Sequence, residues 1–489
     1  MNSFLNAINV THTDNGALTY ASTNNYILDF FYHGATLRND IAKAKDLFYK
    51  AFYLNPTTAL RILFYIRDVR GGQGEREVFR ECMFWLAKEH PVWVFQNWKL
   101  IPEYGRWDDL VQLADASLPI CSQVCKILWE QLVEDIGNMH ADKPVSLLAK
   151  WMPSENASNL ITRARARFIT RSINLSPKTY RKTLVALRRH ISIVENKLRT
   201  KNYKAIKYEE VPSKALLKYR KAFYRNDERR FIEHMESVNN GTAKIHSGTL
   251  YPYEIFEAYN MSSGTWRINY LNERPELEAM WKSLPDYVDD INGLVVADTS
   301  GSMGGRPLAV SLSLAAYISE RNKNEAFKNH FITFDAKPTL QKFEGNTLLE
   351  RMKGIKEINA ANTNLQAVFD LVLDRAMVCN VPKEDMPKVL IIVSDMQFDI
   401  ACRINYRTNL EEIRKRYEAS GYEMPKLVFW NVASHDNVPA KFNNNGVLLL
   451  SGCNPSVLKY AISGAYNPME MVYQITESDR YKNITFNKS

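Results

Sequence analysis

The sequence has no long apolar run, few cysteines, and little glycine or proline. It contains no stretch of about 18 consecutive apolar residues, and its N-terminus lacks the basic flank and apolar core of a secretory signal. Six cysteines in 489 residues are too few and too scattered for a disulfide scaffold, and 20 glycines and 19 prolines exclude a collagen-like or disordered chain. We therefore expect a soluble protein of a reducing compartment such as the cytoplasm, with no membrane partner.

Two residue patterns meet at about residue 285. Before it, segments such as LRILFYIRDV and EREVFRECMFWLAKEH carry apolar residues at helical spacing between short polar breaks, which predicts an α-solenoid over residues 1–285. After it, short β-branched runs such as GLVVA and VLIIVS alternate with helical stretches. That alternation predicts a doubly wound, Rossmann-like α/β sheet of parallel strands over residues 286–489. We expect one further helix in the C-terminal tail, followed by a frayed end.

Positive charge is concentrated in one part of the helical half. The chain has a net charge of +9, but residues 163–230 hold 21 Lys and Arg against five acidic residues, so the rest of the chain is net acidic. Sustained arginine-rich charge suits phosphate contacts, and the alternative is a well-solvated helical surface. The candidate polyanion-binding residues are Arg163, Arg165, Arg167, Arg171, Arg181, Lys182, Arg188, Arg189, Lys218, Arg220, Lys221 and Arg225.

Within this basic stretch an apolar stripe indicates a helix. Leu184, Leu187, Ile191, Val194 and Leu198 recur at steps of three and four residues. The spacing predicts one helix that buries this stripe and turns most of its arginines and lysines outward.

Oxygen-bearing side chains follow the first predicted strand of the second half. In DTSGSM, Asp298, Ser300 and Ser302 alternate in the loop after the strand, Thr363 opens a later helix, and Asp395 ends a later strand. Parallel strands bring such segments to one edge of the sheet. A weakly charged, all-oxygen set suits Mg²⁺ rather than zinc, with Mn²⁺ and Ca²⁺ as alternatives. The other interpretation is a strand-to-helix turn in which Asp and Ser cap the helix.

These five positions resemble the metal-ion-dependent adhesion site of the von Willebrand factor A (vWA) domain, whose pattern is D-x-S-x-S, then a Thr, then an Asp after a later strand. Two departures concern loop geometry rather than ligands. Ala361 and Asn362 stand where the family often has Gly-Gly, and Met396 stands where it often has Gly. The resemblance implies a bound cation that completes its shell with an oxygen from a partner. It implies binding rather than turnover.

The helical half is also similar to a known family. THTDNGALTY, IRDVRGGQGEREVFR, EYGRWDDL, LLAKWMPSEN and VPSKALLKYRKAF resemble segments of a family from phages, large DNA viruses and plants that couples a helical region to a vWA domain. That family is similar in turn to the TROVE module of the Ro autoantigen, a ring of HEAT-like helical repeats closed by a vWA domain. The resemblance implies binding of small structured or single-stranded RNA through the basic helical face.

Other motifs have structural interpretations. RGGQGE lacks the strand and the Lys-Ser/Thr of a phosphate loop, so we expect a turn between helices, with Arg67, Asp68 and Arg70 in a local ion-pair network. Cys121 and Cys125 lack a second ligand pair at zinc spacing, so we expect buried thiols. His435 and Asp436 form a pair near the metal edge, in what we expect to be a surface loop. No nucleophile elbow or zinc-protease motif occurs, so we expect no enzymatic activity.

Two hypotheses follow. The first is a Ro-like RNA-binding protein in which the cation-holding domain closes the helical array. The second is a non-enzymatic scaffold or assembly protein, of viral or phage origin, that captures a protein partner through the metal site.

Overall fold

The computed structural model describes residues 9–487 except 192, 260–271, 289–290, 335–337, 356–362, 400–407, 434, 436 and 463–466. Helices make up the N-terminal half and a largely parallel sheet lies in the C-terminal half, which confirms the expected mixed α and α/β composition. Within the described ranges no helix has both the length and the apolar character needed to cross a membrane.

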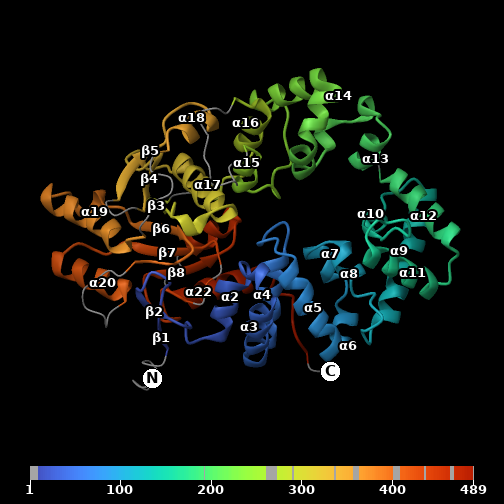
Figure 1. Cartoon of the computed structure of the whole chain (residues 1–489), viewed down its shortest axis with the longest axis horizontal. Coiled ribbons are helices and arrows are strands. Elements are labelled where there is room, and N and C mark those ends of the chain that lie inside the picture. Colours follow the sequence, from blue (N-terminus) through green and yellow to red (C-terminus); the bar gives the residue numbers. More distant parts are fainter. Residues whose placement is uncertain are drawn as a thin grey trace.

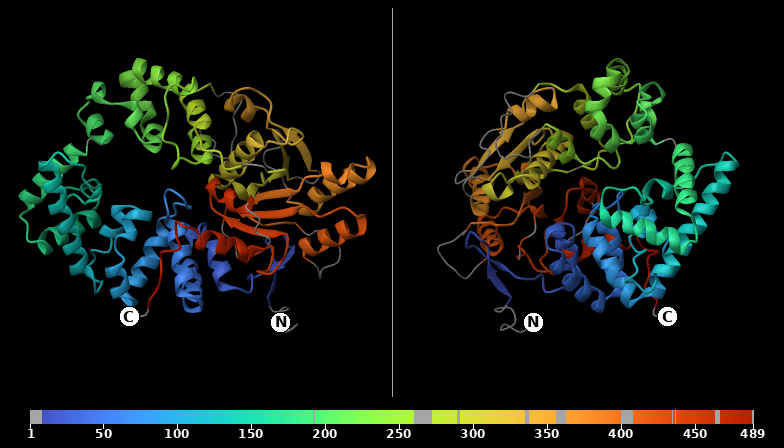
Figure 2. Two further views of the ribbon diagram at one scale, coloured as in Figure 1. Left: turned by 180° about the vertical axis from the view of Figure 1, so that it is seen from behind. Right: turned by 45° about the vertical axis from the view of Figure 1, so that its right-hand side comes forward.

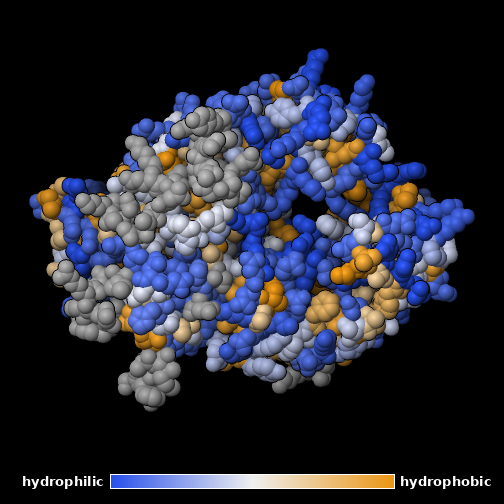
Figure 3. All heavy atoms as spheres, viewed as in Figure 1, coloured by the Kyte–Doolittle hydropathy of each residue, from blue (hydrophilic) through white to orange (hydrophobic). Residues whose placement is uncertain are grey.

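The helical half forms an arc that starts and ends at the sheet (Figures 1 and 2). The first helix of the arc packs on the edge strand β8 (Val447–Ser451), and the arc returns where α15 packs on α17 (Arg306–Arg321). The arc leaves an opening in the middle of the molecule, which the space-filling view shows (Figure 3). Its helices are α2 (Tyr26–Gly34), α3 (Ile41–Leu54), α4 (Pro56–Arg67), α5 (Glu77–Glu89), α6 (Pro91–Gln96), α7 (Leu100–Tyr104), α8 (Trp107–Val111), α9 (Cys121–His140), α10 (Leu148–Trp151), α11 (Leu160–Ser172), α12 (Pro177–His190), α13 (Val194–Arg199), α14 (Ser213–Asn239), α15 (Pro252–Ala258) and α16 (Pro275–Lys282).

Local signals set the ends of several of these helices. The Asn25 and Asn55 side chains accept hydrogen bonds from the first-turn N–H groups of α2 and α4, and Asp40 does the same for α3. Pro56 stands at the first position of α4, where its missing N–H costs no hydrogen bond. These caps let short helices follow one another closely along the chain.

The predicted helix over the apolar stripe of residues 184–198 is in fact two helices. α12 ends at His190 and α13 begins at Val194. The amide of Asn196 donates to the carbonyl of Arg188 (2.6 Å), which satisfies an acceptor that the helix end leaves open. Leu184, Leu187 and Val194 are buried as expected, whereas Ile191 and Leu198, after the break, are half-buried.

The six-stranded sheet has the order β5-β4-β3-β6-β7-β8. All neighbours are parallel except β4 and β5. The antiparallel edge strand β5 was not predicted, because its side chains are largely exposed and carry no apolar run. Besides β8, the strands of this sheet are β3 (Gly293–Ala297), β4 (His330–Thr333), β5 (Thr339–Lys342), β6 (Val389–Ser394) and β7 (Lys426–Asn431). Besides α17, the helices of this half are α18 (Leu348–Lys353), α19 (Leu365–Val378), α20 (Asn409–Ser420), α21 (Leu458–Ile462) and α22 (Pro468–Thr476).

A hairpin of two short strands precedes the first helix. β1 (Val10–His12) pairs with β2 (Leu18–Tyr20), and Tyr20 bridges to Val438 beyond β7. The expectation of a purely helical first half is wrong here. These strands are three residues long, and their tertiary contacts lie about 400 residues away in the sequence, so local periodicity does not reveal them.

The C-terminal tail is ordered, contrary to the expected frayed end. After α22 the chain runs back to the helical half, where Tyr481 and Ile484 are fully buried and the Phe486 ring contacts Phe52 and Trp93. The first and last segments of the chain therefore both join the two halves. A single cluster of buried apolar side chains runs through helices and sheet.

Candidate functional site

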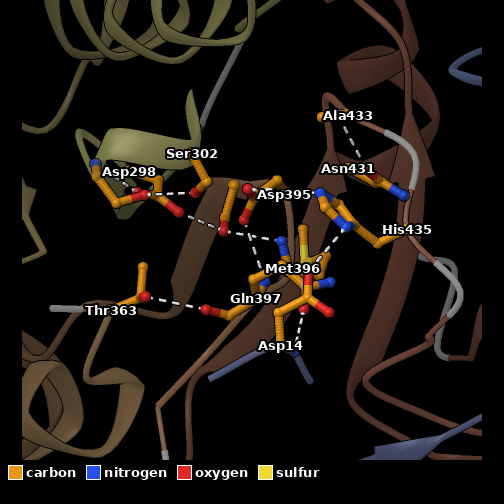
Figure 4. Close-up of polar contacts among 12 residues, drawn as sticks. Asp14, Asp298, Ser302, Thr363, Asp395, Met396, Gln397, Asn431, Ala433 and His435 are labelled. Carbon is orange, nitrogen blue, oxygen red and sulfur yellow. Dashed lines mark hydrogen bonds and ion pairs between the residues drawn. The ribbon is translucent and has the colours of Figure 1, made fainter. Parts of the chain in front are cut away.

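Asp298, Ser300 and Ser302 lie together at the carboxyl end of β3 (Figure 4). Asp298 is fully buried, and its two carboxylate oxygens accept from the Ser300 N–H (2.9 Å) and the Ser394 hydroxyl (2.6 Å). The hydroxyl oxygens of Ser300 and Ser302 are 3.1 Å apart. Ser302 is exposed, so this corner of the site faces outward.

A second buried carboxylate, Asp395, stands at the end of the adjacent strand β6. Burial and the Asp395 charge raise the pKa of Asp298 to about 6. Asp395 Oδ1 accepts from the Gln397 N–H (3.1 Å), while Oδ2 is buried without a hydrogen-bond partner among the described residues. Two crowded carboxylates with an unsatisfied oxygen and two hydroxyls form a donor set that fits a hard divalent cation.

Thr363 lies on the same edge, just before α19, and is buried. Its hydroxyl donates to the Gln397 carbonyl (2.9 Å) and accepts from the Asn15 amide (3.0 Å), which leaves its oxygen one further lone pair. No hydrogen bond within the described residues joins Thr363 to Asp298 or Asp395. Among the departures from the vWA pattern, Met396 has φ of 67°, the left-handed region that favours glycine, and Ala361–Asn362 lie outside the described residues.

The turn of the N-terminal hairpin closes over this edge. The Asp14 N–H donates to Gln397 Oε1 (2.6 Å), and the Asn15 amide also donates to the Gln397 carbonyl (2.7 Å). The His435 ring lies between two carboxylates, with Nδ1 3.5 Å from Asp14 and Nε2 3.6 Å from Asp395. The predicted partner Asp436 is outside the described residues. Sequence reasoning missed the hairpin, although T-D-N-G is a clear turn signal.

The opening in the arc is lined by basic and aromatic side chains. Two adjoining hollows of about 470 and 370 Å³ share Gly74, Arg106, Lys214 and Tyr251, and we call them together the central hollow. Figure 3 shows an opening in the middle of this face, bordered mainly by hydrophilic residues. The cationic residues of the central hollow are Arg38, Arg67, Arg70, Arg76, Arg106, Lys150, Lys214, Lys218 and Arg306, and the acidic ones are Glu75, Glu77 and Glu195.

Several of these cations rest on aromatic rings. The Arg106 guanidinium is 5.1 Å from the Trp151 ring, and Lys214 Nζ is 4.3 Å from the Tyr251 ring. Burial and the nearby Arg67 charge lower the pKa of the Arg106 guanidinium. Of the candidate polyanion contacts, the central hollow includes Lys218 alone. Apart from Lys214, the other cations of the central hollow lie outside residues 163–230, so a local charge count does not find them.

The outer helices α11 and α12 carry the densest part of the predicted basic stretch. Arg167 and Arg171 are exposed on α11, one turn apart, with Arg163 half-buried a turn earlier. Burial lowers the pKa of Arg165 on the same helix. Lys182 and Arg189 are exposed on α12, and Lys221 and Arg225 are exposed on α14.

Three of the predicted contacts have partners inside the protein. The Arg188 guanidinium donates to the carbonyls of Ala149 and Met152 (both 2.8 Å) and to Ser154. Arg220 donates to the carbonyls of Leu217 and Ala258. Arg181 pairs with Glu155 at 3.3 Å. Arg188 and Arg220 therefore brace the backbone as well as carrying charge.

The prediction that Arg67, Asp68 and Arg70 form a local ion-pair network is wrong, because the side chain of each contacts a residue from another segment. Arg67 pairs with Asp109 of α8 (2.7 Å), and Arg70 donates to the Glu103 carbonyl (2.6 Å). Asp68 accepts from Arg480 and Tyr481 of the C-terminal tail. RGGQGE is a turn between α4 and α5, as expected. Of the paired thiols, Cys125 is buried but Cys121 is only half-buried.

These observations define a mixed α/β protein in which a helical arc leaves and rejoins a largely parallel sheet. Residues 13–118 and 119–293 match the family described as "Domain of unknown function (DUF2828)", and the chain belongs to this family. Residues 292–487 match "Domain of unknown function (DUF7788)". The chain is 27% identical to "Uncharacterized protein L728" of Acanthamoeba polyphaga mimivirus over 510 aligned positions, which cover 96% of this chain and 87% of the relative. Among solved structures it is similar to the Ro (RSR) protein of Deinococcus radiodurans, with 13% identity, a TM-score of 0.40 and coverage of 86% of this chain and 91% of that one.

Proposed function

We propose that the protein binds single-stranded or irregular RNA and that the central hollow is the main contact surface. The observation that carries the proposal is the lining of this hollow. Arg70, Arg106 and Lys218 form no ion pair among the described residues, and they line the hollow together with Trp107, Trp151, Tyr219 and Tyr251. The other six cations have carboxylate partners, and one of them, Arg67, is buried. Phosphates are attracted by the cations, and unpaired bases stack on aromatic rings. The exposed arginines of α11 extend the basic surface to the outside of the arc, where paired segments of a small RNA have room to bind.

The second half is proposed to be a vWA-type domain over residues 286–489, preceded by a helical domain over residues 1–285. The strand order, with its antiparallel edge strand, and the sequence pattern support this assignment. A divalent cation, Mg²⁺ before Mn²⁺ or Ca²⁺, would be held by Asp298, Ser300, Ser302, Thr363 and Asp395. The cation would supply the positive charge that the Asp298–Asp395 pair lacks. The proposed activity is binding without turnover.

The test is to purify the full chain at low salt and to sequence the nucleic acid that accompanies it. A discrete set of structured or single-stranded RNAs supports the proposal and identifies the ligand. Binding to the recovered RNA is then measured for Trp151→Leu, with Trp129→Leu as the control, because Trp129 is half-buried on α9 and absent from the central hollow. Loss of one stacking ring weakens binding by about 10-fold or more. A preparation free of nucleic acid, with no gel shift by any RNA, would refute the proposal.

A second candidate is a scaffold that captures a protein carboxylate through the cation. It is favoured by the exposed Ser302, which leaves one corner of the proposed cation site open to a partner oxygen. Asp298→Ala separates the two candidates. If that variant loses a protein partner and keeps RNA, the scaffold function is supported. If it keeps the protein partner and loses RNA, the cation serves closure of the RNA-binding ring.

A further inference from the structure

A separate group of cations lines a shallow hollow between α14 and α16. The hollow has a volume of about 530 Å³, and none of the residues that line it lines the central hollow. Its lining residues are Arg220, Lys221, Tyr224, Arg225, Glu273, Arg274 and Glu276. Arg274 lies outside the basic stretch of the sequence and comes from the start of α16.

Two of the guanidinium groups converge on a single acceptor. Arg220 Nη2 and Arg274 Nη1 both donate to the carbonyl of Ala258, at 3.2 and 2.9 Å. Burial and the neighbouring Arg274 charge lower the pKa of Arg220. Like charges so close together repel each other, and a carbonyl oxygen offsets this repulsion only in part.

No carboxylate of the described residues forms an ion pair with any of the four cations of this hollow. The nearly buried Glu276 accepts from the Tyr224 hydroxyl at 3.0 Å, and Glu273 contacts Thr347. Elsewhere on α14, Lys214, Arg229 and Arg230 each pair with a carboxylate, and Arg229 lies 2.8 Å from Glu233. The hollow therefore has four cations and two acidic side chains, which gives its lining a net positive charge.

We propose that this hollow binds a phosphate group that carries two or more negative charges, a terminal phosphate monoester or a pyrophosphate. Guanidinium groups donate in pairs to phosphate oxygens, and a terminal phosphate has three such oxygens and a second pKa near 6. A phosphodiester has a single charge and would leave the pair of arginines less well neutralised. The dianionic group matches the net charge of the hollow.

The site adjoins the central hollow along one strip of α14. Lys218, Lys221 and Arg225 are spaced by three and four residues, so they share a face of the helix, and Lys218 also lines the central hollow. An RNA strand in the central hollow would have its terminal phosphate within reach of this strip. If the ligand is the terminal phosphate of an RNA, the inference rests on the proposed function. A free pyrophosphate would bind whether or not the protein binds RNA.

The first experiment titrates the full-length protein with sodium pyrophosphate in a calorimeter. The wild type is expected to bind one pyrophosphate, and Arg274→Gln and Arg225→Gln are each expected to weaken binding by about 10-fold, the loss of one charge-assisted contact. Arg225 is exposed, and its guanidinium has no hydrogen-bond or ion-pair partner among the described residues, so its replacement tests the site even if Arg274→Gln disturbs the Ala258 contact. Arg229→Gln, 90% exposed on the same helix, is the matched control and should bind as the wild type does.

The second experiment compares one RNA oligonucleotide with terminal phosphates and with terminal hydroxyls. A preference for the phosphorylated ends that Arg274→Gln abolishes identifies the ligand as an RNA terminus. Pyrophosphate binding without a preference for phosphorylated RNA ends identifies the ligand as a free phosphate compound. This result would support the phosphate site even if the protein bound no RNA. Absence of pyrophosphate binding, or equal binding by Arg225→Gln and the wild type, would overturn the proposal.

Discussion

Arg480 donates from both Nε and Nη2 to the carboxylate of Asp68, although 412 residues separate them. Asp68 is fully buried in the turn after α4, and it also accepts from the Tyr481 hydroxyl (2.8 Å). The C-terminal tail is thereby fixed to the start of the helical arc. At the opposite end of the chain, the N-terminal hairpin bonds to the sheet edge at Gln397. The two halves are thus interlocked through both ends of the chain.

Removing this tail contact is expected to destabilise the whole protein. Arg480→Met leaves the buried Asp68 carboxylate with the Tyr481 hydroxyl and the Arg70 N–H as its polar partners. We expect the free energy of unfolding to fall by about 2–4 kcal/mol, because a buried charge loses its counter-ion. Lys482→Ala is the control, since Lys482 pairs only with the exposed Asp479, and it should change stability by less than about 0.5 kcal/mol. Urea unfolding curves measure both, and equal midpoints would contradict this prediction.

Asp109 is the centre of a second buried network of ion pairs. Replacing it should lower the free energy of unfolding more than Arg480→Met does. Its carboxylate accepts from Arg67 (Nε, 2.8 Å) and from Arg80 (Nε, 2.7 Å), and the Arg67 side chain is 2% exposed. Asp109→Asn would leave the buried Arg67 without a carboxylate partner and Arg80 with Asp108 alone. We expect a loss of about 3–5 kcal/mol in the free energy of unfolding. Asp46→Asn, which removes an exposed pair with Lys50, should stay within about 0.5 kcal/mol. A small effect of Asp109→Asn would mean that the arginines find other partners.

Periodicity predicted the parts of the fold that are locally determined. The strand GLVVA and the helices at 306–321 and 365–378 follow directly from apolar spacing, and parallel pairing then brings Asp298 and Asp395 to neighbouring strand ends. Periodicity does not predict the hydrogen bond between Asn15 and Thr363, which are 348 positions apart in the sequence. Its existence depends on how the hairpin docks on the finished sheet.

Charge counting identified a basic face but not which cations are free to bind. Arg188 counts as a positive charge in the sequence, yet its guanidinium donates to two backbone carbonyls and to the Ser154 hydroxyl. Arg38, Arg106 and Arg306 belong to segments with no local excess of charge, and the closure of the arc gathers them around one opening. Such a surface is a property of the tertiary structure, since no single segment contains it.

The stability of the cation-free protein should depend on pH through Asp298. Its pKa rises from 3.8 to about 6 on folding, so the native state binds the proton more tightly than the unfolded state does. The contribution of this group is therefore favourable at low pH and is lost as the pH rises from about 4 to about 6, by about 3 kcal/mol in all. Asp298→Asn removes this loss. In the presence of a chelator, the variant should gain stability relative to the wild type across that pH window, and parallel curves would contradict the prediction.

Mg²⁺ should offset the loss of stability that ionised Asp298 causes in the wild type. Above pH 6 the ionised Asp298 and Asp395 attract the cation, so Mg²⁺ should raise the melting temperature of the wild type at pH 7.5. At pH 5 the proton on Asp298 competes with the cation, and the shift should be smaller. Asp298→Asn should show little shift at either pH. A magnesium effect that persists in this variant would place the cation elsewhere.

The arginines of α11 should contribute to RNA binding mainly through charge. Replacing Arg163, Arg167 and Arg171 with Glu reverses three charges on one exposed helix face, and we expect RNA binding to be lost at physiological salt. With the milder Gln replacements, the slope of log Kd against log salt should fall by about 2, because three phosphate contacts to a single strand are removed.

The control for the α11 variants carries the same change of net charge on the other half of the molecule. Lys383 and Lys388 precede β6 and Lys415 lies on α20, and all three are exposed. Because α20 lies on the opposite side of the molecule from α11 and α12 (Figure 1), replacement of these lysines with Glu should leave affinity and salt slope close to those of the wild type. If both triple variants lose RNA equally, the binding responds to the overall charge of the protein and not to the α11 face. If only the α11 variant loses RNA, the outer surface of the arc takes part in the complex, and the central hollow alone does not account for the affinity.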